Sequence, residues 1–226
     1  MRVSLRLAFC LISLMIGMAQ TVHSQTNDAA YVVTYIEVMP VSTSQAIDLL
    51  VDHAEASHDD DGNSLFQVLQ RIGRPNHFAI LETWADADAQ ETHASAGHTR
   101  AFRAALDPLL YSPYDQRLHT ELHVGGRADT GGSIYGLTHI DIIPTGLNEG
   151  LERIAALVAA SRGDAGVVRF DVLTQVSRRN HMTLVESWES VGSQEAHSTA
   201  GHKKVFRDAL QPLSGSLYDE RLYRVL

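Results

Sequence analysis

The stretch "ETWADADAQETHASAGHTRAF" at residues 82–102 is repeated, with substitutions, as "ESWESVGSQEAHSTAGHKKVF" at residues 186–206. The offset of 104 positions extends well beyond these stretches. Residues 31–122 align with residues 135–226 without a gap, and 34 of the 92 pairs are identical. A match of this length indicates an internal duplication. We therefore predict two domains, residues 31–122 and 135–226, each large enough for a small domain.

The segment between the copies, "HVGGRADTGGSI" at residues 123–134, contains four glycines among mostly polar residues. Glycine-rich polar segments behave as flexible chains. We expect a linker here that holds the two copies close together.

Each copy has the same pattern of hydrophobic residues. In the first copy, alternating β-branched and aromatic residues predict strands, and apolar residues at helical spacing predict helices. The predicted order is a strand at residues 31–40, a helix within 42–57, a hairpin of strands 65–71 and 77–84, a helix at 87–110 interrupted near Gly97, and a strand at 114–122. This β-α-β-β-α-β order is the ferredoxin-like arrangement of the α+β class.

A four-stranded antiparallel sheet with helices on one face leaves its other face uncovered. On the first predicted strand this face carries Tyr31, Val33, Tyr35 and Glu37, a mixed apolar and aromatic set rather than one typical of a face in water. We therefore expect the two sheets to pack against each other, which forms a pseudo-dimeric α+β barrel within one chain.

The N-terminus has the pattern of a signal peptide. Arg2 and Arg6 precede an apolar run of about 13 residues, and the small residues Val22 and Ser24 follow it. The run is shorter than the roughly 20 residues that span a bilayer, although a retained anchor is the alternative. We predict cleavage after residues 1–24 and a secreted or periplasmic protein.

The predicted mature chain is acidic and has no cysteine. Loss of Arg2 and Arg6 leaves 16 basic residues against 27 acidic ones, a formal charge of −11. This charge disfavours binding to nucleic acid or to an anionic membrane. Cys10 lies inside the signal segment, so the mature chain has no disulfide, thiolate nucleophile or cysteine metal ligand.

Two histidines, His93 and His98, recur as His197 and His202. On a continuous helix, five residues turn the chain by about 500°, so the two side chains would point about 140° apart. That spacing does not allow both to bind one metal, and no metal site is predicted. A helix break at Gly97 would change this geometry.

The second histidine of each copy shares an apolar stripe with the following phenylalanine. His98, Phe102, Ala105 and Leu109 follow one another at helical spacing. If the helix restarts at Gly97, its positive dipole end disfavours a protonated imidazole there. A neutral imidazole can act as a general base, and the alternative is a histidine that only satisfies the core.

The only tryptophans, Trp84 and Trp188, share a strand face with Glu82 and Glu186. Each glutamate either bonds to neighbouring groups in the core or takes part in chemistry. Each tryptophan either fills the core or lines a pocket for a flat aromatic ligand.

The motif E-x-W-x8-H-x4-H-x3-F, placed after a hairpin in this fold, resembles the antibiotic biosynthesis monooxygenase family, including quinol monooxygenase-like proteins. The resemblance implies a dimeric α+β barrel, with the partner supplied here by the second copy. It also implies oxidation of a small phenol or quinol by O2 with neither a metal nor a flavin cofactor. The residues that it singles out as catalytic are His98 and His202, and those for substrate binding are Trp84, Trp188, His93, His197, Phe102 and Phe206.

Two other functions remain open from the sequence. The chain could be a non-catalytic module that binds a small ligand or has a structural role. Haem-degrading relatives use an Asn, a Trp and an axial His, whereas the first strands here lack Asn. The position matched to the axial His holds Arg103 and Arg207, which disfavours haem binding or degradation.

Overall fold

The computed structural model describes residues 28–125 and 131–226. The predicted signal peptide and residues 126–130 of the predicted linker lie outside these ranges. Within them, no helix is both long enough and apolar enough to cross a membrane.

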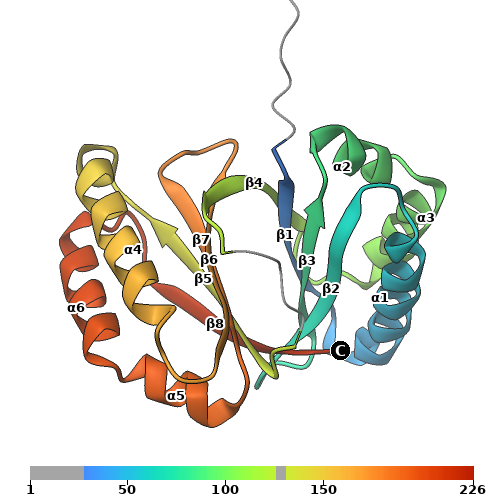
Figure 1. The fold of residues 1–226 in the computed structure, drawn as a ribbon. Helices are drawn as coiled ribbons and strands as arrows, with labels where there is room; N and C mark the ends of the chain where they lie inside the picture. Colours follow the sequence, from blue (N-terminus) through green and yellow to red (C-terminus); the bar gives the residue numbers. More distant parts are fainter. Residues whose placement is uncertain (1–27, 126–130) are drawn as a thin grey trace, which may run out of the picture.

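Each copy forms one module of the predicted type, with its second helix divided in two (Figure 1). Module one consists of β1 (Ala30–Glu37), α1 (Thr43–His58), β2 (Asn63–Arg71), β3 (His77–Trp84), α2 (Ala87–Ala94), α3 (Gly97–Leu106) and β4 (Asp115–His123). Module two consists of β5 (Ile134–Asp141), α4 (Leu147–Ser161), β6 (Val167–Gln175), β7 (His181–Trp188), α5 (Val191–Ser198), α6 (Gly201–Leu210) and β8 (Asp219–Val225). The predicted β-α-β-β-α-β order is confirmed in both copies.

The strands close into one barrel in the order β1-β3-β2-β8-β5-β7-β6-β4, and β4 pairs with β1. The last strand of each module joins the other module, because β4 pairs with β6 and β8 pairs with β2. Two antiparallel seams therefore connect the copies, and the closed sheet has no exposed edge strand. The predicted pseudo-dimeric barrel is confirmed.

The barrel separates three apolar cores. One lies inside it and contains the predicted inward residues Tyr31 and Val33 together with Tyr135, Leu137 and Tyr223. The other two lie between the sheet and the helices, which flank the barrel on opposite sides (Figure 1). Four of the candidate site residues, Trp84, Phe102, Trp188 and Phe206, belong to these two outer cores.

The break between α2 and α3 is the feature of the fold that matters most for the site. Ala96 is extended, with φ −64° and ψ 155°, and α3 begins at Gly97 as predicted. The apolar stripe predicted for α3 is wrong in part, because Ala105 is exposed and His98 is half-buried. The buried residues are Thr99, Phe102 and Leu106. A tighter 3₁₀ turn follows α3 and rotates Leu109 onto this face.

Candidate functional site

The third strand of each module places a buried glutamate beside a buried tryptophan. Side chains alternate along a strand, so Glu82 and Trp84 share the face that packs against the helices. Trp84 Nε1 donates a hydrogen bond to Glu82 Oε2 at 2.9 Å. Trp188 Nε1 donates to Glu186 Oε2 at 3.2 Å in module two. Each pair is therefore one fixed unit, and the indole satisfies part of the carboxylate.

The first histidine of each pair lies on this unit. The ring of His93 stacks on Trp84 with 4.5 Å between centroids, and its Nδ1 lies 2.7 Å from Oδ2 of Asp60. His197 stacks on Trp188 at 4.6 Å and bonds to Asp164 at 2.7 Å in the same way. Both histidines are almost fully buried. The aspartate and the tryptophan together fix the orientation of the ring.

The second histidine approaches the same aspartate from the next helix. His98 Nε2 lies 3.2 Å from Asp60 Oδ2, and His202 Nε2 lies 3.0 Å from Asp164 Oδ2. The side chains of these two histidines are 28% and 26% exposed. The expectation that the histidines of each pair point apart is wrong, because the chain breaks between the helices that carry them.

Burial sets the protonation of these groups. It lowers the pKa of His93 and of His197, and the hydrogen bonds to Asp60 and Asp164 oppose this effect only in part. Burial raises the pKa of Glu82 to about 7, although the hydrogen bond from Trp84 acts to lower it. At neutral pH the buried imidazoles are therefore uncharged, as expected for groups in a low-dielectric core.

Module one has an extra histidine beside the pair. The ring of His53 on α1 lies 5.5 Å from His93 and 5.7 Å from His98, and Leu157 takes its place in module two. The pKa of His53 is lowered to about 3, mainly by burial and to a smaller extent by the nearby His93 and His98.

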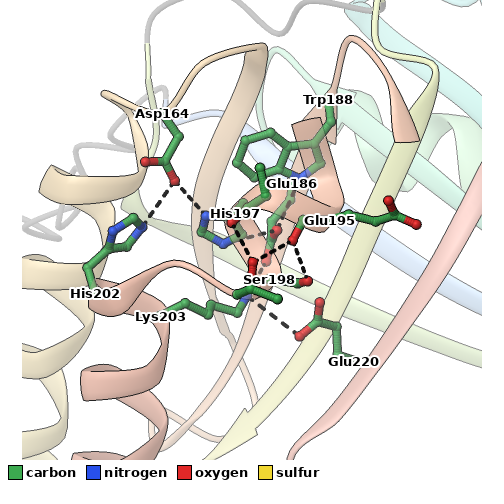
Figure 2. A network of polar contacts seen from close by, with 11 residues as sticks. Asp164, Glu186, Trp188, Glu195, His197, Ser198, His202, Lys203 and Glu220 are labelled. Atoms are coloured by element: carbon green, nitrogen blue, oxygen red, sulfur yellow. Dashed lines mark hydrogen bonds and ion pairs between the residues drawn. The ribbon is translucent and has the colours of Figure 1, made fainter. Parts of the chain in front are cut away.

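Module two has a buried lysine where module one has Thr99. Lys203 Nζ lies 3.0 Å from Glu186 Oε1 and 3.6 Å from Glu220 Oε2 (Figure 2). Burial alone would lower the pKa of Lys203, but Glu186 and its other neighbours raise it above the ordinary value. The buried glutamate of module two therefore has a cationic partner in addition to its tryptophan, whereas Thr99 stands in place of that cation in module one.

A cavity of about 560 Å³ opens in module two between the α5–α6 break and the loop before β8. Its wall includes Lys204, Arg207, Leu210 and Tyr218. The Arg207 guanidinium carbon lies 5.1 Å from the centre of the Tyr218 ring, and Lys203 Nζ lies 5.9 Å from it on the protein side. Tyr218 thus separates the cavity from the buried Lys203–Glu186 pair.

The tyrosine has a different setting in module one. There the Arg103 guanidinium carbon lies only 3.3 Å from the centre of the Tyr114 ring and covers it. Burial raises the pKa of both Tyr114 and Tyr218 to about 12, so both hydroxyls stay protonated at neutral pH.

The predicted substrate-binding residues lie in the outer cores rather than on the wall of this cavity. All six are buried: Trp84, Trp188, His93, His197, Phe102 and Phe206. His98 and His202 reach the surface at the aspartate, and neither lines the cavity. Their binding and catalytic roles therefore stay predictions.

Sequence reasoning did not identify Asp60, Asp164, Lys203 or Tyr218. A signal existed for the two aspartates, because Asp60 is the only member of the run "DDD" whose partner 104 positions later is also acidic. Tyr218 repeats Tyr114, but a lone tyrosine near a strand is unremarkable in a sequence. Lys203 has no counterpart, so the repeat gives no sign of it.

Comparison with known proteins identifies the family of both modules. The family model described as antibiotic biosynthesis monooxygenase matches residues 29–105 and 134–209. A protein of Bacillus subtilis (strain 168) named "Putative monooxygenase YcnE" is 30% identical over 88 residues, which cover 39% of this chain and 92% of that protein. One module therefore corresponds to nearly the whole of that relative.

Solved structures show the same two-module fold. A crystal structure named "Putative monooxygenase", from Fusobacterium nucleatum, has a TM-score of 0.78 at 15% identity and covers 89% of this chain and 94% of its own. A crystal structure of an anthrone oxidase-like protein has a TM-score of 0.72 at 13% identity, and the match covers 89% of this chain and 92% of that protein. At these identities the likeness concerns the fold alone.

Proposed function

Because the chain belongs to the antibiotic biosynthesis monooxygenase family, we propose that it oxidises a small phenol or quinol with O2 in the module-two cavity. The substrate itself supplies the electrons, so that a quinol and O2 give a hydroxyquinone and water. The observation that carries the proposal is the cavity of about 560 Å³ beside Tyr218 and Arg207. Its volume is in the range of small-molecule sites.

The charges of the cavity wall suit a phenolate. Arg207 lines the cavity and carries a positive charge, whereas Lys204 on the same wall is paired with Asp208, with 2.6 Å between Nζ and Oδ2. A nearby cation favours the ionised form of a phenol. The phenolate gives up an electron to O2 more readily than the neutral phenol does, so Arg207 would assist the first step of the oxidation.

Tyr218 is the aromatic residue of the cavity wall. Its hydroxyl is buried and has no hydrogen-bond partner of good geometry among the described residues. Burial raises its pKa to about 12 in spite of the nearby Lys203, so it remains a donor. Because protein atoms cover the hydroxyl, a phenolate oxygen in the cavity would accept that hydrogen bond once the side chain turns toward the cavity.

The internal repeat supplies matched controls for the test. The chain without residues 1–24 is mixed with a benzoquinol or naphthoquinol, and O2 uptake is followed with an electrode. We expect Tyr218→Phe and Arg207→Gln to lower kcat/KM about tenfold or more, as loss of a charge-assisted contact does. Tyr114→Phe and Arg103→Gln should leave it within about twofold. Equal losses in both modules, or no O2 uptake above the uncatalysed rate, would refute the proposal.

A second function, binding without turnover, is favoured by one observation. The tryptophans and first histidines are packed in the cores, which is how purely structural residues behave. Saturable quenching of protein fluorescence by a quinol, with O2 uptake no faster than in its absence, would identify a binding protein.

We also infer that the protein is exported. The support is the sequence pattern of residues 1–24, where two arginines precede a short apolar run. Expression of the full chain should give a product in the periplasm or medium whose mass lacks this segment. A cell-retained product of full mass contradicts export.

A further inference from the structure

Each module brings two imidazole nitrogens and one carboxylate oxygen into a single cluster. In module one these are His93 Nδ1, His98 Nε2 and Asp60 Oδ2, which all lie within 4.8 Å of one another. Module two repeats the cluster with His197, His202 and Asp164 (Figure 2). The three residues come from three elements: the turn after the first helix and the two short helices.

We propose that each cluster binds a divalent first-row transition metal ion, of the class of Zn²⁺ or Co²⁺, giving two ions per chain. Two imidazoles and one carboxylate form a ligand set that this class of ion prefers. The proposal goes beyond the oxidation in the module-two cavity, because none of the cluster residues lines that cavity and the clusters occur in both modules.

The spacing of the ligand atoms fits such an ion. Bonds of about 2.0–2.1 Å at roughly 90–110° place neighbouring ligand atoms about 2.9–3.4 Å apart. The Asp60 oxygen lies 2.7 Å from His93 Nδ1 and 3.2 Å from His98 Nε2. In module two these distances are 2.7 and 3.0 Å. The two imidazole nitrogens of each cluster lie within 4.8 Å of each other, so the rings can close on an ion beside the carboxylate.

The second histidine of each cluster has an unsatisfied nitrogen. His98 Nε2 and His202 Nε2 are buried atoms that make no hydrogen bond of good geometry among the described residues, although an aspartate oxygen is close to each. A direct hydrogen bond would need the oxygen in line with the N–H group. A metal ion between the two rings would give each of these nitrogens a partner.

A buried carboxylate lies behind the first histidine. His93 Nε2 faces Glu82 Oε2 at 4.0 Å, and His197 Nε2 faces Glu186 Oε2 at 3.7 Å. Metal-binding histidines commonly present their other ring nitrogen to a carboxylate, which fixes the tautomer and the ring orientation. The indole stacked on each ring holds its plane in addition.

The clusters are open on one side. The side chains of Asp60 and His98 are about one quarter exposed, as are those of Asp164 and His202. The nitrogens of the second histidines are covered, so these partly exposed rings would turn to admit an ion from solvent. Three protein ligands then leave coordination positions for water or an added ligand. Module two carries the extra buried cation Lys203 beside Glu186, so we expect its ion to bind more weakly.

The test uses the chain without residues 1–24 and without a histidine tag, first stripped of metal with a chelator. Co²⁺ is added, and its visible absorption and bound stoichiometry are recorded. We expect the signal to rise to two equivalents per chain and Zn²⁺ to displace it. Asp60→Asn and Asp164→Asn should each remove one equivalent. The control is Asp61→Asn, an exposed neighbour outside the cluster, which should keep both.

His98→Gln and His202→Gln, at half-buried positions, provide a second pair of variants if an aspartate variant fails to fold. Circular dichroism checks the fold of each variant. Binding that is equally strong in the double variant Asp60→Asn/Asp164→Asn, or no binding at all to the stripped chain, overturns the proposal. The result is independent of quinol oxidation, because it is read from bound metal rather than from O2 uptake.

Discussion

Lys203 Nζ lies 3.0 Å from Glu186 Oε1, and both side chains are almost completely removed from solvent, at 1% and 0% exposure. This buried ion pair distinguishes the two modules, because Thr99 takes the place of the lysine in module one. Removal of one partner from a buried ion pair leaves an uncompensated charge, which destabilises a protein far more than loss of a surface pair.

Lys203→Met is therefore expected to lower the free energy of unfolding by roughly 3–5 kcal/mol, as measured by urea denaturation. The double variant Lys203→Met/Glu186→Gln should recover part of that loss, because it removes the isolated carboxylate as well. Thr99→Val at the matched position should change stability by about 1 kcal/mol or less. A Lys203→Met variant as stable as the parent would show that the pair is not energetically coupled.

Gly62 is expected to be essential for the turn that carries Asp60. Its φ is +81°, and a Cβ atom there would lie 2.7 Å from the Cβ of Ala89. Gly62→Ala should cost roughly 1–3 kcal/mol of stability through backbone strain and crowding. Gly97→Ala is the control, since Gly97 has an ordinary φ and open space around its Cα. Equal thermal stability of the two variants would contradict this assignment.

The pH dependence of stability should carry a contribution from His119. Its ring is buried in the barrel between the Arg117 carbonyl and the Thr183 hydroxyl, at 2.9 Å from each. Burial lowers its pKa to about 4, below the ordinary value of 6.5. The unfolded chain therefore takes up the proton first, and stability is lost as the pH falls from about 6.5 to 4.

His119→Gln removes this titration. Its free energy of unfolding should fall less than that of the parent between pH 7 and 4, with a difference of up to roughly 3 kcal/mol. The measurement is urea denaturation of both proteins at several pH values. Parallel pH curves would show that the histidine does not titrate as inferred.

The fold was predictable because its signals are local or repeated. The alternation in the strands, the apolar spacing in the helices and the 104-residue offset can all be read directly from the sequence. The seams between modules, β4 with β6 and β8 with β2, were expected only as packing of two sheets. The pairing itself joins distant segments, and no short pattern specifies it.

The site was predictable only in part. The pairing of Glu82 with Trp84 follows from the alternation of side chains along a strand. The start of a new helix at Gly97 was indicated by the glycine itself. The convergence of His93 and His98 on Asp60 does not follow, because it depends on the angle between two helices across a break. That angle is set by packing of Phe102 and Leu106 in the core rather than by local sequence.

The most direct test of the proposed oxidation is the fate of labelled oxygen. The chain without residues 1–24 is incubated with a quinol under ¹⁸O₂, and the quinone product is analysed by mass spectrometry. The account predicts a hydroxyquinone with one added ¹⁸O atom, formed at a rate that falls in Arg207→Gln and not in Arg103→Gln. A product without added label, or none above the protein-free reaction, would contradict it.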